Sequence, residues 1–236
     1  MTSLVQEHSL SLIGLVETKV RDGNHTPILK YFLPGWTMVH NYNHNSSGRI
    51  WVLWNSEVLD VSMVFTSDQY IHLSAVIIEK QIRFQATFIY GHNTAPKRLP
   101  LWNDLLSLRR SLPWILLGDF NVVRFMNERL GGDPDWPPHM EDLNSCCTEA
   151  MLEDLKATSF HYTWDNRSSG DRFLTRKLDR VLVNPDWMST FPLAKAAFLP
   201  AGSLDHSPTV VNLGVELYRR RGDLPFFQFL GYSLRF

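Results

Sequence analysis

The sequence predicts a mixed α/β fold in which two β-sheets pack face to face beneath helices. Runs rich in β-branched and aromatic residues recur between turn signals, and segments of helical periodicity lie among them. A chain of 236 residues that is 44% hydrophobic can also bury one large core, and two-sheet or α/β domains of about 200–250 residues are common as single units. We therefore expect one domain.

The predicted strands of the N-terminal part are short and are separated by polar or glycine-containing loops. The loop EKQ at residues 79–81 is short enough to close a hairpin. Strands are expected at residues 10–16, 37–42, 49–54, 61–66, 71–78 and 82–90.

Apolar residues at helical spacing predict two helices, at residues 96–112 and 139–155. A buried strand is expected between them, within residues 113–123. Further strands are expected at residues 160–166, 176–184, 194–200 and 207–213. The domain is predicted to cover residues 1–216. Residues 217–236 are basic and then aromatic without a clear period, which predicts a C-terminal tail.

Composition limits which compartments and which binding partners we expect. The formal net charge of −1 provides no overall basic field, so contact with nucleic acid would have to come from local patches. Cys146 and Cys147 are adjacent, which favours neither a disulfide framework nor a zinc site. No apolar stretch is long enough for a membrane span, and the N-terminus does not read as a signal peptide. We expect a nuclear or cytoplasmic protein that is not secreted and has no membrane partner.

The stretch GDFN, at residues 118–121, ends the buried strand with polar side chains. Asp119 and Asn121 are separated by one residue, so in an extended segment they face the same side while Phe120 faces the core. Polar groups just beyond strand ends commonly line the cleft of an α/β sheet. A carboxylate beside a carboxamide can hold a water molecule and a phosphate oxygen. The alternative is a turn cap, in which both side chains satisfy loop amides.

Three other segments carry weaker signals of the same kind. Glu17 ends an apolar strand, where a carboxylate can bind a hard divalent cation, although a solvated strand end is the alternative. Asp179 lies within an apolar strand, where a carboxylate is costly unless it has a partner such as a histidine. Asp205 and His206 lie between a turn and a strand, and their alternative is a solvated loop.

The segments ETK, YGHN, GDFN, LDRVLVN and DHSP occur in this order, and as a set they resemble the endonuclease/exonuclease/phosphatase superfamily, which has the fold of DNase I and of the apurinic/apyrimidinic endonucleases. The phrases YTWDNRSSGDRFLTRKLDRVLVNPDW and DHSPTVV are similar to the endonuclease domain of plant non-LTR (LINE-type) retrotransposons, which a reverse transcriptase follows. The resemblance implies a four-layer α/β sandwich of two mixed β-sheets flanked by helices.

The resemblance also implies a metal site and substrate contacts. Glu17 matches the glutamate that binds Mg²⁺, with Mn²⁺ as an alternative ion, and Asp205 matches a residue near the metal. Tyr90 matches a catalytic tyrosine at the phosphate, and Asn93 matches an asparagine that contacts the substrate. No small-molecule cofactor beyond the divalent metal is expected.

Four residues match the catalytic groups of the family. Asp119 matches the residue that orients and deprotonates the attacking water, and Asn121 matches the asparagine beside it. His206 matches the histidine that donates to a phosphate oxygen, and Asp179 matches the carboxylate that orients this histidine. The chemistry supports these types, because phosphodiester hydrolysis builds negative charge that a cation and an imidazolium stabilise. Either metal coordination or a phenol could assist the leaving oxygen.

One element of the family pattern is absent from the sequence. Members begin with a strand that carries an active-site asparagine, in a WNVRGL-like phrase, whereas this chain starts at MTSLVQEHSLSL. The resemblance therefore implies an N-terminally truncated domain that lacks its first strand and is impaired in catalysis. A missing central strand would leave unpaired backbone groups in the sheet.

The resulting functional prediction is an Mg²⁺-dependent endonuclease that nicks DNA and leaves a 3′-hydroxyl. Residues 97–110 carry four basic residues against one acidic residue, and residues 167–180 carry five against two. These patches could contact DNA phosphates, although a solvated face is the alternative. The alternative function is a non-catalytic retroelement remnant that at most binds nucleic acid.

Overall fold

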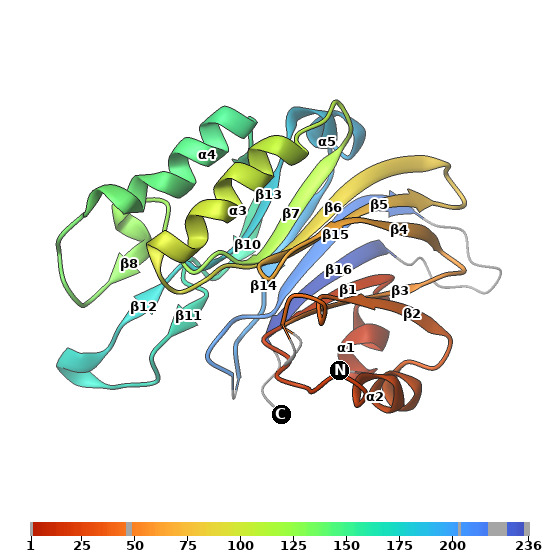
Figure 1. Ribbon diagram of the computed structural model, residues 1–236, viewed down its shortest axis with the longest axis horizontal. Helices are drawn as coiled ribbons and strands as arrows, with labels where there is room; N and C mark the ends of the chain where they lie inside the picture. Colours follow the sequence, from red (N-terminus) through yellow and green to blue (C-terminus); the bar gives the residue numbers. More distant parts are fainter. Residues whose placement is uncertain (1, 46–48, 203, 217–225, 234–236) are drawn as a thin grey trace.

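The computed structural model describes residues 2–45, 49–202, 204–216 and 226–233, and Figure 1 shows how their strands and helices are arranged. The first sheet contains seven strands, in the order β10 (Ala157–Ser159), β14 (Lys195–Phe198), β15 (Thr209–Glu216), β16 (Phe226–Ser233), β1 (Leu12–Val16), β3 (Ile50–Asn55) and β2 (Trp36–His40). The second contains six, in the order β4 (Leu59–Thr66), β5 (Tyr70–Ile77), β6 (Ile82–Tyr90), β7 (Trp114–Asp119), β13 (Asp179–Val183) and β9 (Glu153–Asp154).

The largest cluster of buried apolar residues lies between these two sheets, because each sheet directs one row of side chains toward the other. Leu12 and Val52 contribute from the first sheet, and Ile71, Phe88 and Leu117 contribute from the second. This shared core fixes the two sheets against each other.

Helices cover the outer face of each sheet (Figure 1). Helices α3 (Ala95–Leu108) and α4 (Asp142–Ala150) pack on the second sheet, where Leu105 and Leu143 contact the residues of β7. Helix α2 (His25–Phe32) packs on the first sheet against Ile13 and Trp51, and α1 (Thr2–Glu7) lies on the same side. The four layers of the predicted sandwich are thus present.

A three-stranded sheet projects from one end of the sandwich. Its strands are β11 (Trp164–Asp165), β12 (Thr175–Arg176) and β8 (Arg129–Leu130). The remaining elements are α5 (Pro185–Thr190) and the 3₁₀ turns η1 (Met126–Glu128), η2 (Pro138–Glu141) and η3 (Gly170–Arg172). Among the residues described, no helix is long and apolar enough to cross a membrane.

The predicted helices end earlier than their periodicity suggests. The helix predicted at 96–112 ends at Leu108, and the one predicted at 139–155 begins as the turn η2 and ends at Ala150. Met151 adopts a left-handed conformation with φ of 55°, which stops the second helix, and Leu152 donates back to the carbonyl of Cys147. Cys146 and Cys147 are buried on α4 among apolar residues.

The sequence prediction is wrong about the C-terminal part in one respect. Strand β16 pairs in parallel with β1 and antiparallel with β15, so residues 226–233 form a central strand and not a tail. The unpaired sheet edge expected beside β1 is therefore absent from the described chain, because β16 occupies this position. Residues 217–225 lie outside the described part, and the domain boundary at residue 216 stays a prediction.

Candidate active site

The centre of the site is a pair of carboxylates at adjacent strand ends. Asp119 is the last residue of β7 and Asp179 is the first residue of β13, and the antiparallel register places them directly opposite each other. Both residues are buried, with exposed fractions of 3% and 7%. Like charges opposite each other in a ladder are unfavourable, so this pair requires a compensating positive group.

His206 is that positive group. Its Nδ1 atom lies 2.8 Å from Oδ2 of Asp179, and its Nε2 atom lies 3.9 Å from Oδ2 of Asp119. The hydrogen bond predicted between Asp179 and His206 is therefore confirmed, and so is the burial of Asp179. An imidazole bridging two carboxylates can hold a proton on each ring nitrogen.

Thr163, which the sequence analysis did not single out, holds these groups in register. Its hydroxyl oxygen accepts hydrogen bonds from the backbone amides of Leu178 and Asp179, at 3.0 and 2.9 Å. Its carbonyl oxygen accepts from the amide of Ser207 at 2.7 Å. Thr163 thus ties the start of β13 to the loop of His206. A threonine within the strand predicted at residues 160–166 gives no sequence signal for this role.

Asn121 lies beside Asp119 but not by the geometry predicted. The chain is not extended at Asn121, whose φ is 51°, and its amide donates to Oδ1 of Asp119 at 2.8 Å. Its side-chain nitrogen donates to the carbonyl of Gly91 at 2.7 Å. Phe120 is fully buried in the core beneath the helices, as predicted. The side chain of Asp119 therefore caps the turn, and the side chain of Asn121 links the loop after β7 to the loop after β6.

Glu17 and Tyr90 form the other side of the site. Tyr90 ends β6 and pairs with Asp119 in the parallel register of β6 and β7. Glu17 follows β1 with φ of 57°, a left-handed conformation that is uncommon for a residue with a side chain and often marks a functional site. Glu17 also pairs with Lys19 at 2.9 Å. The first sheet thus contributes Glu17 to the site, and the second sheet contributes Tyr90.

Burial and neighbouring charges shift the pKa values of three groups in the site. Burial and the negative charges of Glu17 and Asp119 raise the pKa of Tyr90, so its phenol keeps its proton. Burial and repulsion from Asp179 raise the pKa of Asp119. Burial alone lowers the pKa of His206, but the attraction of Asp179 and its hydrogen bond outweigh burial and raise the pKa to about 10. His206 is therefore an imidazolium at neutral pH.

The remaining predicted residues lie near the rim. Asp205 is half-buried next to His206, and its negative charge helps to raise the pKa of His206. Asn93 is exposed in the loop that follows Tyr90. The structure thus brings Glu17, Asp119, Asn121, Asp205 and His206 to one end of the sandwich, and the role of each residue stays a prediction.

The two basic segments offer fewer free charges than their sequences suggest. Arg98 is buried and donates to the carbonyl of His92 at 2.6 Å. Arg180 is fully buried and binds Glu128 and Asp154. Both side chains are occupied inside the protein, so neither adds to the positive charge that these segments could present to DNA phosphates.

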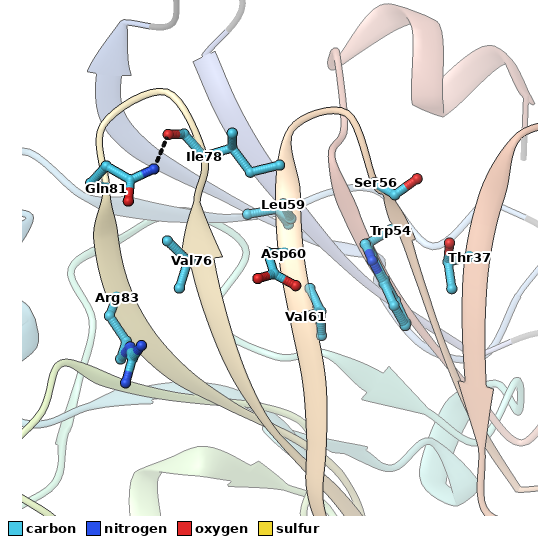
Figure 2. Close-up of a pocket in the computed structure, with 10 residues that line it drawn as sticks. All are labelled: Thr37, Trp54, Ser56, Leu59, Asp60, Val61, Val76, Ile78, Gln81 and Arg83. Atoms are coloured by element: carbon cyan, nitrogen blue, oxygen red, sulfur yellow. Dashed lines mark hydrogen bonds between the residues drawn. The ribbon is translucent and has the colours of Figure 1, made fainter.

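A separate pocket of about 720 Å³ lies at the opposite end of the strands and is drawn in Figure 2. Its lining includes Arg83, near the start of β6, and Asp60, near the start of β4, whereas Tyr90 and Asp119 stand at the ends of β6 and β7. Asp60 and Arg83 are exposed. The pocket therefore belongs to a different region from the carboxylate site.

The fold is shared with solved structures of low sequence identity. The endonuclease domain of TRAS1, a telomere-specific non-LTR retrotransposon, is 13% identical, with a TM-score of 0.63 over 87% of this chain and 99% of that chain. An AP endonuclease from Leishmania major is also 13% identical, with a TM-score of 0.67 over 88% of this chain and 79% of that one. TDP2 from D. rerio, complexed with a single-stranded DNA product, is 12% identical, with a TM-score of 0.54 over 87% and 86%.

These similarities and the two-sheet topology define a DNase I-like α/β sandwich. The chain belongs to the endonuclease/exonuclease/phosphatase family, whose sequence profile matches residues 1–199. A search of curated proteins finds no significant match.

Proposed function

We propose that this protein is a divalent-metal-dependent endonuclease that hydrolyses a DNA phosphodiester at the site around Asp119. The observation that carries the proposal is the buried cluster in which Asp119 and Asp179 flank the imidazolium of His206. Family membership and the structural similarity to DNA-processing enzymes support this assignment. The retrotransposon type rests on the sequence phrases and on the similarity to TRAS1.

The donor chemistry fits a hard divalent cation on the Glu17 side of the site. Carboxylate oxygens are preferred ligands of Mg²⁺, which usually binds through one or two carboxylates together with waters and substrate phosphate. Glu17, with Asp205, would hold the ion. His206 is an unsuitable ligand, because a metal-bound imidazole must be deprotonated and the pKa of His206 is raised to about 10. When bound, the ion would polarise a phosphoryl oxygen and offset its charge.

The protein groups have complementary tasks in this mechanism. Asp119 accepts a proton from the attacking water, and Asn121 orients the groups beside it. Burial and Asp179 raise the pKa of Asp119, whereas the positive charge of His206 lowers it and so favours the carboxylate form that this step requires. His206 donates to a phosphate oxygen, and Asp179 keeps it protonated and oriented. Tyr90, which keeps its proton, donates to the leaving oxygen in this proposal.

The test is a nicking assay on supercoiled plasmid with Mg²⁺, with chelator, and with Mg²⁺ restored after chelation. We expect nicked circles only when the metal is present, and we expect a DNA polymerase to extend the nicks because they carry a 3′-hydroxyl. Nicking in excess chelator would contradict metal dependence. Binding of DNA without nicking in Mg²⁺ would favour the alternative of a non-catalytic remnant.

A further inference from the structure

Arg49 lies on the side of the site that is remote from His206. Its guanidinium carbon lies 5.4 Å from the centre of the Tyr90 ring, within the range of a cation–π contact. Tyr90 pairs with Asp119 along β6 and β7, and Asp179 pairs with Asp119 from the other neighbouring strand, β13. Asp119 is therefore the central member of the row, with Arg49 over one neighbour and His206 bound to the other.

The position of Arg49 is held by a fully buried carboxamide. The Oδ1 atom of Asn41 accepts hydrogen bonds from the amides of Arg49 and Ile50, at 3.2 and 3.0 Å. The Nδ2 atom of Asn41 donates to the carbonyl of Ser67 at 3.1 Å. Asn41 thus ties the start of β3 to the turn between β4 and β5. The backbone of Arg49 is fixed even though it stands at the beginning of a strand.

A cation at the position of Arg49 offsets the negative charge of the site. Glu17, Asp119, Asp179 and Asp205 collect negative charge where a phosphodiester, itself an anion, has to approach. The positive charge of His206 is already shared between Asp179 and Asp119. A stacked guanidinium keeps its plane fixed and its donors oriented, which suits binding of phosphate oxygens.

We propose that Arg49, stacked on Tyr90 and anchored through Asn41, is a substrate-binding residue that contacts a non-bridging phosphate oxygen of the DNA at or next to the cleaved bond. This inference rests on the proposed nuclease function. Arg49, which precedes β3 of the first sheet, then supplies positive charge on one side of Asp119, and His206 supplies it on the other.

The test compares Arg49→Gln and Arg49→Lys with Arg83→Gln as the matched control. Arg83 is an exposed arginine at the other end of the strands, beside the pocket of Figure 2. Binding of a short fluorescein-labelled DNA duplex is measured by anisotropy in Ca²⁺ buffer at several salt concentrations, and nicking kinetics are measured in Mg²⁺. Thermal unfolding of each variant verifies that it folds.

Loss of one charge-assisted contact should raise the Kd of Arg49→Gln about 10- to 100-fold. The slope of log K against log salt should also become shallower by about 0.9, because one phosphate contact is lost. Arg49→Lys should keep the wild-type slope and bind with intermediate affinity, since it retains the charge without the planar fork. A merely structural role would not change the slope.

The outcomes separate this inference from the proposed function. Wild-type Kd and slope in folded Arg49→Gln, or equal changes in Arg83→Gln, would overturn the role of Arg49 even if the wild type nicks DNA. Binding that depends on Arg49 without any nicking in Mg²⁺ would support the contact and overturn the nuclease. A wild-type protein that neither binds nor nicks DNA would overturn both.

Discussion

At the scale of single residues, the protonation state of His206 decides what the site can do. Asp179 is the group that raises the pKa of His206 most, and burial acts in the opposite direction. His206 is thus protonated because of its partner Asp179 and not because of its own basicity alone. Its proton compensates the two carboxylates that face each other across β7 and β13.

Asp179→Asn should therefore shift the alkaline limb of the pH profile. In the wild type, His206 stays protonated until the pH approaches about 10, so kcat/KM should be maintained to high pH. Without the carboxylate, burial lowers the pKa and only Asp119 and Asp205 still raise it, so activity should decline at a lower pH than in the wild type. The profile of kcat/KM measures this shift. An unchanged alkaline limb in Asp179→Asn would show that this ion pair does not control the reaction.

A second prediction at the scale of single residues concerns His72 and the pH dependence of stability. Burial, and then the charge of Arg110, lower the pKa of His72 to about 4, below the ordinary value of 6.5. Between these values the unfolded chain binds a proton that the folded chain does not, so stability falls as pH decreases from about 6.5 to about 4. The ring is fully buried, and its Nδ1 atom is hydrogen-bonded to the hydroxyl of Thr87 at 2.7 Å.

Replacing His72 with Gln should remove part of this acid sensitivity, on the order of 3 kcal/mol at most. Urea unfolding at neutral pH and at about pH 4.5 measures the difference. The exposed His139→Gln variant is the control and should retain the wild-type dependence. Equal acid sensitivity in the His72 and His139 variants would exclude His72 as its source.

At the scale of elements, a buried ion network positions the loop that follows Asp119. Arg180 on β13 binds Glu128 of η1, and its Nη1 atom lies 3.0 Å from Oδ1 of Asp154 on β9. Oε2 of Glu128 accepts the amide of Arg124 at 2.6 Å. The network thus connects three elements on the face of the sheet behind the site.

Arg180→Met should destabilise the protein by about 3–5 kcal/mol, because it leaves the Glu128 carboxylate buried without its partner. Arg180→Met combined with Glu128→Gln should cost less than the sum of the single changes, since the uncompensated charge is then absent. Chemical unfolding of the four proteins forms the required cycle. Strict additivity would show that the two side chains do not stabilise each other.

Strand β16 makes a prediction for the first sheet. Leu230 pairs with Ile13 on β1 and with Val210 on β15, so its backbone belongs to two ladders. Leu230→Pro removes an amide from a central strand and should lower the free energy of unfolding by about 1–3 kcal/mol or more. Leu230→Val keeps the amide and is the control. A Leu230→Pro protein as stable as Leu230→Val would contradict the pairing.

At the scale of the whole molecule, the sequence predicts most of the fold but not the strand that completes the first sheet. The period-two runs and helical repeats place β1 to β7, α3 and α4, because their buried faces impose strong patterns on the sequence. The prediction missed the helices α1, α2 and α5 and the strands β8, β9, β10 and β16, of which β9 lies within the helix predicted at residues 139–155. Helix α2 has no fully buried residue, and β16 is recognised only by the position that it fills between two remote strands.

The site shows the same division between local signals and remote contacts. The ordered segments and their family resemblance pointed to Asp119, Asp179 and His206 and to the bond between the last two, since these residues stand at recognisable strand ends. The roles of Thr163, Asn41 and Arg49 depend on contacts between segments far apart in the chain. No spacing within a segment could reveal them.

The central claim is that DNA cleavage depends on Asp119, and the most direct measurement is the initial nicking rate of Asp119→Asn in Mg²⁺. The control is Asp60→Asn, which alters an exposed carboxylate beside the pocket at the other end of the strands. Removal of the general base should lower the rate of Asp119→Asn by about 10²–10⁴-fold, while Asp60→Asn should match the wild type. Nicking at the wild-type rate in a folded Asp119→Asn protein would contradict the account.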